Sequence, residues 1–304
     1  MTQELSRDSI RFPSSGHIWV PRSGGRAAAA GMSMYSPCAL PAVFAQRALY
    51  VAVRVLGPRI MPGRRDAWSD PIESEVWEAF VDEWHAAFGA WDSMALYRRP
   101  QRGRTGCAIL LLREGRGVGF VRITTDRERA SNEFAVMSGV HAARPATFRI
   151  ARPVGWGSMD GWSWIGTESV PNYPLGAVRR ESVRLKVIDE LAGILDDVLP
   201  RASSVPRGWR GSHGDFSPWN LRTEIGGAVR VIDWEDAGFA PPGIDALYGG
   251  LTAHLTFGTA LPRSTNQEAV EWIGRVLMSR RADDEDANEL NSRLIELLRT
   301  VPAA

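Results

Sequence analysis

The stretch that decides the fold of this chain is SHGDFSPWNL at positions 212–221, followed by RVIDWE at positions 230–235. Gly226 and Gly227 lie between the two segments. They favour a hairpin with a two-residue turn, because both central residues of such a turn adopt positive φ angles. The segments on either side of the glycines are therefore predicted to be two paired antiparallel strands.

The predicted hairpin brings three polar side chains together. Counting back from the turn along both strands places Asn220 directly opposite Asp233, with Cβ atoms about 4.5–5.5 Å apart. An amide oxygen and a carboxylate oxygen are hard ligands that suit Mg²⁺. Pro218 keeps the preceding segment out of a helix, so Asp215 is expected on irregular backbone close to this pair. A metal beside a carboxylate that can orient a hydroxyl group is the arrangement that phosphoryl transfer requires.

These residues carry a resemblance to a known family. The His-x-Asp loop, the Ile-Asp-Trp strand and the later Asp-Ala-Leu segment resemble motifs of the aminoglycoside phosphotransferases and choline kinases, relatives of the protein kinases. The resemblance implies that Asp215 is the catalytic base and that His213 organises the catalytic loop. It also implies that Asn220 and Asp233 bind the Mg²⁺ that bridges the phosphates of ATP. Asp245 is expected to be a buried structural residue near the loop.

The order of predicted elements fits the fold of that family, a two-lobed, protein-kinase-like α+β fold. A small antiparallel N-lobe is expected over residues 91–170, with strands at 94–97, 107–113, 118–124, 148–154 and 162–167 and one helix at 126–140. A mainly helical C-lobe is expected over 171–304, with helices at 180–198, 244–257, 267–279 and 284–300. Residues 1–90 are predicted to form a separate, partly helical N-terminal extension.

The predicted N-lobe offers an ion pair for nucleotide binding. By the resemblance, Arg122 stands on the third strand where the family has lysine, and Glu133 in the following helix is its expected partner. Lys186 is the only lysine among 36 basic residues, and it falls in a predicted C-lobe helix. Arginine is bulkier than lysine and has a different donor geometry, so its presence predicts altered nucleotide binding. A surface position without a role in the site is the alternative for Arg122.

Two further segments are candidates for nucleotide contacts. Gly103 and Gly106 lie between two predicted strands, in a loop whose backbone N–H groups can approach phosphate oxygens, although a plain hairpin turn fits the same residues. Segment 166–171 has the position of the hinge that receives adenine in the family, which makes Glu168 and Val170 candidates for nucleotide binding. Contact with solvent alone is the alternative for the carboxylate of Glu168.

Composition limits the partners and the compartment that we expect. The formal net charge is +1, from 36 basic and 35 acidic residues, so it gives no reason to expect a nucleic acid or an anionic membrane as partner. Cys38 and Cys107 are too far apart in sequence to suggest a zinc site or a disulfide framework. A reducing, cytoplasmic compartment is therefore predicted. The sequence indicates no particular protein partner.

The most apolar long stretch, residues 39–57, is interrupted by two arginines and is therefore a poor candidate for a membrane span. It predicts an amphipathic helix in which Phe44, Leu49, Val53 and Leu56 share the stripe that packs on the core. A helix lying in a membrane interface is the alternative.

The resulting functional prediction is an ATP- and Mg²⁺-dependent O-phosphotransferase that acts on a hydroxyl group of a small molecule. The fragments at 19–21 and 34–37 resemble the lead-in of phosphotransferase-like proteins associated with polysaccharide biosynthesis, which favours a sugar or glycan precursor as acceptor. Twelve tryptophans, Trp219 among them, supply faces that can stack on sugars, although core packing is the alternative for most of them. The rival prediction is a catalytically silent kinase-like module that binds a nucleotide or a protein partner.

Overall fold

The computed structural model describes residues 8–13, 16–68, 70–98, 106–170, 172–264, 266–283 and 288–302. The described chain divides into two compact units. The first holds the residues up to 134 together with 151–175, and the second holds 135–150 and the residues from 176 onward. The first unit is built on an antiparallel sheet and the second is mainly helical, which agrees with the predicted α+β class.

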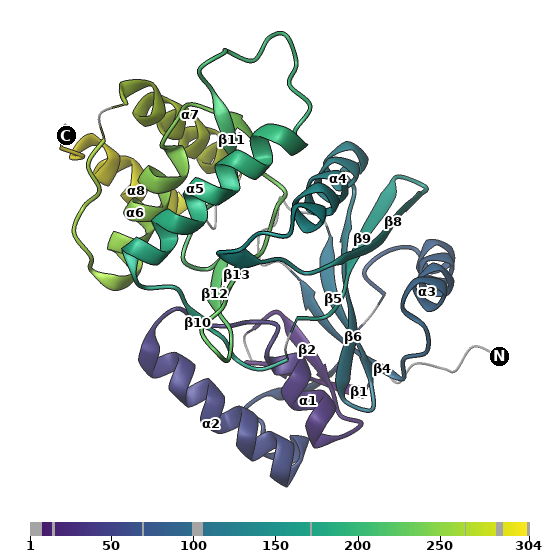
Figure 1. The fold of residues 1–304 in the computed structure, drawn as a ribbon. Coiled ribbons are helices and arrows are strands. Elements are labelled where there is room, and N and C mark those ends of the chain that lie inside the picture. The colour runs from purple at the N-terminus through teal and green to yellow at the C-terminus, as the bar shows by residue number, and fades with distance from the viewer. Residues whose placement is uncertain are drawn as a thin grey trace. The chain divides into compact units, whose positions relative to one another are not determined.

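The first unit contains an eight-stranded sheet in which all neighbouring strands are antiparallel, in the order β3-β1-β2-β4-β5-β6-β9-β8 (Figure 1). The strands are β1 (Asp8–Phe12), β2 (Ile18–Pro21), β3 (Arg64–Ala67), β4 (Ser93–Arg98), β5 (Cys107–Arg113), β6 (Arg116–Thr124), β8 (Pro153–Met159) and β9 (Trp162–Thr167). The helices of this unit are α1 (Gly25–Met32), α2 (Leu40–Leu56) and α3 (Ser74–Phe88), with a short 3₁₀ turn at Pro58–Ile60. Helix α4 (Arg127–Ala143) begins in the first unit and ends in the second.

The N-terminal segment is part of this sheet, which differs from the separate extension expected for residues 1–90. Strand β2 pairs with β4, so the sheet continues from the expected N-lobe strands into β2, β1 and β3. The short apolar run at positions 17–20 favours a strand at β2. Strand β3 has the sequence RRDA, which lacks the alternating apolar pattern that identifies a strand.

The central part of the sheet is buried on both faces, as β5 shows. Successive side chains of a strand point to opposite faces. Ile109 and Leu111 accordingly join a core formed with α3, whereas Leu110 and Leu112 join a second core with the alanines of α1. A strand buried on both sides has a continuous apolar sequence, as CAILLLR does.

Tryptophans fill the core between α3 and the sheet. Six of the twelve tryptophans are buried there, namely Trp19, Trp68, Trp77, Trp84, Trp91 and Trp164. Trp77 and Trp84 stand about two helical turns apart on α3 and meet edge to face, with ring centroids 5.4 Å apart. Packing of the interior, rather than stacking on a ligand, therefore accounts for these residues.

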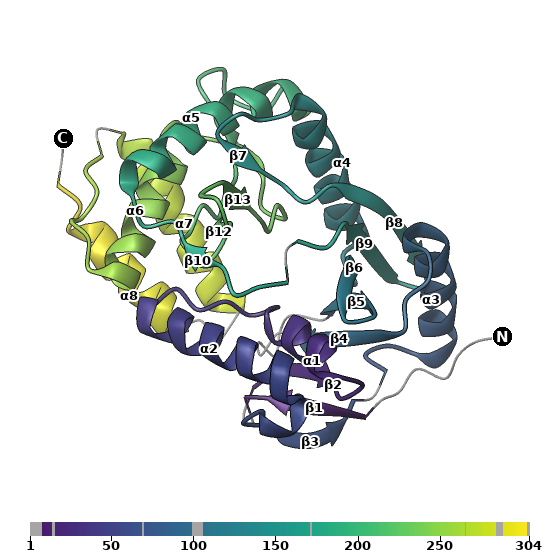
Figure 2. The same cartoon turned by 60° about the horizontal axis from the view of Figure 1, so that its bottom comes forward.

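Helix α2 packs on the first unit through a different stripe from the one predicted. Its buried residues are Val43, Gln46, Tyr50 and Val53. Tyr50 and Val53 join a core with β1, β2 and α1 (Figure 2). Of the expected stripe, Val53 is buried and Leu49 packs against the same core, but Phe44 and Leu56 are 62% and 68% exposed. The prediction failed because α2 is apolar on both sides, so hydrophobicity alone does not identify the packed side. Among the described residues, no helix combines the length and apolar character needed to cross a membrane.

The second unit combines short strands with four long helices. Strands β10 (Gly176–Ala177), β12 (Leu221–Thr223), β13 (Val229–Val231) and β7 (Phe148–Arg149) form one sheet in that order, and β11 (Arg210–Ser212) pairs with β14 (Gly238–Ala240). The helices are α5 (Glu181–Val198), α6 (Ile244–Phe257), α7 (Gln267–Asp283) and α8 (Asn288–Arg299). One core joins α5 to the β12–β13 hairpin, and another is shared by α6, α7 and α8.

The two thiols should differ sharply in reactivity, because only the thiolate form of cysteine is nucleophilic. Burial raises the pKa of Cys107 to about 12, so this thiol stays protonated and shielded at about pH 8, whereas Cys38 is only half-buried. We expect a thiol reagent to label one cysteine rapidly in the native protein and both in denaturant. Cys38→Ser should remove the rapid reaction; equally rapid labelling of both thiols in the native protein would contradict the buried position of Cys107.

Candidate active site

The catalytic loop predicted from the sequence begins where β11 ends and is tied down by one carboxylate. Asp245, buried in the first turn of α6, accepts hydrogen bonds from the backbone N–H groups of His213 (2.8 Å) and Gly214 (3.1 Å) and from Oγ of Ser212 (2.9 Å). Burial raises the pKa of Asp245, while His213 and these donors act in the opposite direction. The contacts agree with the structural role that the resemblance implies for this residue.

Two glycines let the loop approach its neighbours. Gly214 has a φ angle of 80°, and a Cβ at this position would collide with the backbone oxygen of Asp236. Gly249 on α6 faces the loop from the other side, where a Cβ would lie only 2.7 Å from the backbone oxygen of Phe216. A side chain at either position would push the loop away from its supports.

His213 is fully buried between two aromatic rings. Its ring centroid lies 4.9 Å from that of Trp234 and 6.1 Å from that of Phe216. Neither ring nitrogen has a hydrogen-bond partner in the described part of the chain. This environment fits the loop-organising role predicted for His213, and it places the imidazole away from solvent.

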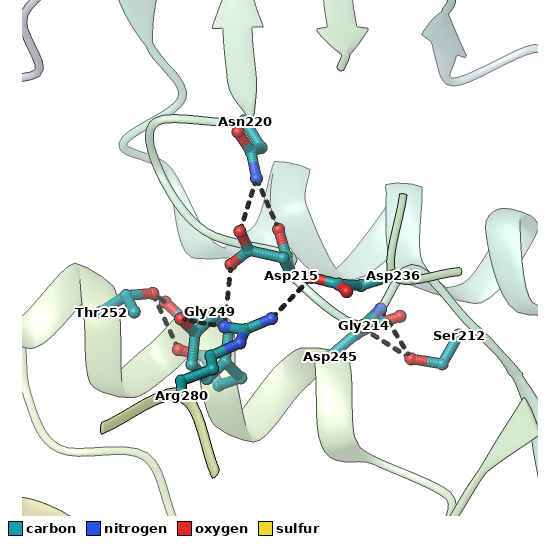
Figure 3. Close-up of polar contacts among 10 residues, drawn as sticks. Ser212, Gly214, Asp215, Asn220, Asp236, Asp245, Gly249, Thr252 and Arg280 are labelled. Carbon is teal, nitrogen blue, oxygen red and sulfur yellow. Dashed lines mark hydrogen bonds and ion pairs between the residues drawn. The ribbon is translucent and has the colours of Figure 1, made fainter. Parts of the chain in front are cut away.

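Asp215 and Asn220 contact each other, as the sequence suggested. The side-chain amide nitrogen of Asn220 donates to the backbone oxygen of Asp215 (2.9 Å) and to its Oδ2 atom (3.0 Å) (Figure 3). A further bond, from the backbone N–H of Ser217 to the backbone oxygen of Asp215 (2.9 Å), closes the intervening turn. Because an amide group is planar, the oxygen of Asn220 points away from Asp215.

The hairpin after Asn220 has a register one residue away from the predicted one. The backbone N–H of Glu224 donates to the oxygen of Ala228 (2.8 Å), so three residues rather than two form the loop. Asn220 is therefore opposite Ile232, whose N–H donates to its backbone oxygen (3.0 Å), and not opposite Asp233. The two glycines do adopt positive φ angles, but they occupy the second and third loop positions. Three-residue hairpin loops with glycine at the last position are a common alternative to two-residue turns.

Asp233 follows the end of β13 in a left-handed backbone conformation, with a φ angle of 67°. Only a few per cent of residues other than glycine adopt this conformation, and such outliers cluster at functional sites. The change of backbone direction leaves Asp233 outside the strand and one residue beyond the partner of Asn220. Both candidate metal ligands thus remain at the same end of the hairpin despite the shifted register.

The oxygen ligands offered by Asn220 and Asp233 suit Mg²⁺ better than a metal ion that needs several protein ligands. In the described part of the chain, no three His, Cys, Asp or Glu side chains gather closely enough to hold a metal ion. The amide oxygen of Asn220 is turned away from Asp215, and Asp233 supplies a carboxylate at the same end of the hairpin. Mg²⁺ commonly takes one or two such oxygens and completes its shell with water and phosphates.

Arg280 is a member of the site that sequence reasoning missed. Its Nη2 donates to Oδ2 of Asp236 (2.7 Å), its Nη1 donates to the hydroxyl oxygen of Tyr248 (3.1 Å), and Nη1 lies 3.9 Å from Oδ1 of Asp215 (Figure 3). Burial by itself lowers the pKa of Arg280, but Tyr248, Asp215 and Asp236 raise it above its ordinary value. The predicted helix ended at Ser279, whereas α7 continues through Arg280, and no local motif marks this arginine.

In the first unit, Arg122 and Glu133 form the ion pair that the resemblance implies. Arg122 lies on β6 and Glu133 on α4, and their side chains are 14% and 7% exposed. The alternative of a surface-facing Arg122 is therefore wrong.

The other nucleotide-binding candidates are less clearly defined. Gly106 has a φ angle of 116°, and a Cβ there would collide with the backbone oxygen of Ile123. Close packing therefore suffices to explain this glycine, and Gly103 lies outside the described residues. Glu168 follows β9 and is engaged by Arg152, whose backbone N–H donates to Oε1 (3.2 Å) and whose Nε lies 3.6 Å from Oε2. The backbone oxygen of Val170 accepts a hydrogen bond from Oγ of Ser169 (3.0 Å).

Comparison with known families finds one match, within the second part of the chain. Residues 140–282 match the phosphotransferase enzyme family. The matched segment contains His213, Asp215, Asn220, Asp233 and Arg280, whereas the Arg122–Glu133 pair precedes it. None of the curated proteins matches this chain significantly.

Several solved structures resemble about three quarters of the chain at low sequence identity. Spectinomycin phosphotransferase APH(9)-Ia, in complex with ADP and spectinomycin, aligns with a TM-score of 0.49 and 8% identity, over 76% of this chain and 95% of that protein. A thermostable mutant of aminoglycoside phosphotransferase APH(4)-Ia aligns with a TM-score of 0.49 and 12% identity, over 72% and 98%. A putative fructosamine-3-kinase from Haemophilus somnus 129PT gives a TM-score of 0.47 and 12% identity, over 74% and 97%.

Proposed function

We propose that this chain, whose residues 140–282 match the phosphotransferase enzyme family, transfers the γ-phosphoryl group of ATP to a hydroxyl group of a small molecule. The observation that carries the proposal is the geometry around Asp215, whose carboxylate is held by the amide of Asn220 beside the hairpin that ends in Asp233. A sugar or glycan precursor is the class of acceptor that we propose to test first.

In this proposal Asp215 orients the acceptor hydroxyl group and takes its proton as the oxygen attacks phosphorus. Its two carboxylate oxygens have different surroundings. Oδ1 is buried on the side of Arg280, so Oδ2 is the oxygen left for a hydroxyl group. Oδ2 already accepts one hydrogen bond from Asn220, and a carboxylate oxygen has a second lone pair that can accept another. Asn220 and Arg280 thus fix the carboxylate in one orientation from opposite sides.

Asn220 and Asp233 are the proposed Mg²⁺ ligands, through the amide oxygen and the carboxylate. When bound, Mg²⁺ supplies charge neutralisation for the phosphates of the nucleotide. Asp233 adopts its left-handed conformation just beyond β13, and the hydrogen bond from the N–H of Ile232 to the backbone oxygen of Asn220 fixes the backbone beside both residues. Asn220 and Asp233 both stand on a hairpin closed by backbone hydrogen bonds, so their backbone is already ordered before Mg²⁺ binds.

Arg122 is the proposed contact to the phosphates of ATP in the first unit, with Glu133 holding its guanidinium group. A guanidinium group can bind a carboxylate through one edge and a phosphate through another. The rival function, a module that binds nucleotide without catalysis, is favoured by the same observation, because arginine stands where the family has lysine.

The test uses the full chain, ATP labelled in the γ-phosphate, Mg²⁺ and a panel of monosaccharides, amino sugars and polyols. We expect a labelled acceptor that appears with Mg²⁺ and disappears when EDTA is added. Saturable binding of ATP without transfer to any acceptor would favour the silent module. Absence of both binding and transfer would reject the phosphotransferase proposal.

The role of Arg122 can be tested separately from catalysis. We expect Arg122→Ala to weaken ATP binding by about 10- to 150-fold, because a hydrogen bond to a charged group contributes about 1.5–3 kcal/mol. We expect Arg122→Lys to preserve or improve the binding. Calorimetric titration measures the dissociation constant, and a melting curve reports folding. Arg116→Ala, on the exposed start of the same strand, is the matched control. If neither substitution of Arg122 changes the affinity for ATP, this residue does not belong to the nucleotide site.

A further inference from the structure

Positive charge is concentrated in one part of the chain, although the total is nearly balanced. Residues 9–65 contain eight arginines and no lysine, aspartate or glutamate, which gives this segment a formal charge of +8 against +1 for the whole protein. Two of the eight, Arg22 and Arg65, pair with the preceding Asp8. The segment comprises β1, β2, α1, α2 and the start of β3.

The same segment carries an exposed apolar stripe along α2. Leu40, Phe44, Val51 and Val55 are 45%, 62%, 54% and 74% exposed. Their spacing of four, seven and four residues places them on one side of the helix. This side lies away from Val43, Gln46, Tyr50 and Val53, which pack on the first unit. Ile60, 41% exposed in the 3₁₀ turn that follows, adds apolar surface beyond the end of the helix.

Cationic side chains border this stripe. Arg54 on α2 and Arg59 in the following 3₁₀ turn are exposed. Arg54 Nη1 donates to the hydroxyl oxygen of Tyr50 (3.2 Å), which leaves most of its guanidinium donors available. Arg47 is more strongly held, since its Nε donates to the backbone oxygen of Pro174 (3.0 Å). α2 therefore presents apolar side chains flanked by arginine, with no acidic residue along its length.

We propose that the outer side of α2, defined by Leu40, Phe44, Val51 and Val55, docks the protein on an anionic lipid bilayer, with the helix parallel to the membrane surface. Amphipathic helices bind in this way when an apolar side enters the headgroup region and neighbouring cations meet anionic lipids. Long arginine side chains can lie along apolar surface and still reach phosphate groups.

Charge and chemistry favour this occupant over two others. A second copy of the chain would bring one cationic segment against another, which is unfavourable for a symmetric contact. A nucleic acid would meet the arginines but would leave the apolar stripe without a partner. A bilayer with anionic headgroups satisfies both parts of the surface. The inference does not depend on the proposed catalytic activity.

Sedimentation with vesicles tests the proposal on the full chain. The vesicles contain phosphatidylcholine alone or phosphatidylcholine with phosphatidylglycerol. We expect binding to the anionic vesicles at least about tenfold tighter than to the neutral ones, and we expect it to weaken when NaCl is raised from about 0.05 to about 0.5 M.

Two variants separate the apolar from the cationic contribution. Phe44→Ser with Val51→Ser should abolish binding, and Arg54→Gln with Arg59→Gln should weaken it about tenfold. Leu185→Ser, at a 41% exposed position on α5, is the matched control and should bind like the unchanged protein. Melting curves identify any variant that fails to fold, and Phe44→Ala is the milder substitute.

The proposal is overturned if anionic vesicles bind no protein, or if the Phe44 and Val51 substitutions leave binding unchanged. The protein could instead fail to bind vesicles and form a dimer in light scattering. If the Phe44 and Val51 substitutions dissociate that dimer, the surface binds a second copy of the chain.

Discussion

Asp215→Asn should remove phosphoryl transfer while leaving the fold intact. The amide retains an oxygen that can accept from Asn220, so the turn keeps its hydrogen bond, but the side chain can no longer take a proton from the acceptor. Loss of a positioned general base lowers kcat by about 10²–10⁴-fold. Release of ADP under saturating ATP and acceptor measures kcat, and calorimetric titration should give an unchanged affinity for ATP.

Asp160→Asn is the matched control for this experiment. Asp160 is exposed in the turn between β8 and β9 and has a φ angle of 47°, a conformation that asparagine tolerates. The same chemical change should therefore leave kcat unchanged there. If Asp215→Asn keeps more than about a third of the activity, the carboxylate is not the general base.

Asp245→Ala should destabilise the second unit by at least about 3 kcal/mol, because it leaves three buried donors without an acceptor and each costs about 1–3 kcal/mol. The substitution would leave two backbone N–H groups and the hydroxyl group of Ser212 without their acceptor inside the protein. Urea unfolding followed by circular dichroism measures the free energy of unfolding.

Asp245→Asn and Glu181→Ala make the result specific. Asparagine keeps one acceptor oxygen, so its loss of stability should be about half as large. Glu181 occupies the first turn of α5 as Asp245 does in α6, but it is exposed, so its replacement costs only the interaction with the helix dipole, about 0.3–1 kcal/mol. A free energy of unfolding for Asp245→Ala within about 1 kcal/mol of that for Glu181→Ala would show that the buried donors find other acceptors.

The sequence predicts the catalytic loop well because its determinants are local. Pro218 excludes a helix, and Gly226 and Gly227 mark the turn that follows. The register of that turn was missed, since two- and three-residue hairpin loops place glycine at overlapping positions. The backbone hydrogen bond between Glu224 and Ala228 sets the three-residue loop, and no residue type in the sequence predicts that bond.

Residues that reach the site from distant elements could not be predicted in the same way. Arg280 contacts the catalytic loop through the packing of α7, and one arginine among 35 carries no signal of its own. The packed side of α2 was also mistaken, because Phe44 and Val53 are equally apolar in sequence while only one of them is buried. Tertiary packing, rather than composition or periodicity, determines both outcomes.

The continuous eight-stranded sheet has a consequence for any shortened version of this protein. A chain beginning at residue 91 would lose β2, and β4 would then become an open edge with unpaired N–H and C=O groups. Trp19 would also be missing from the core that α3 shares with the sheet. Such a fragment is expected to aggregate through its new edge, so the N-terminal residues protect the sheet from self-association.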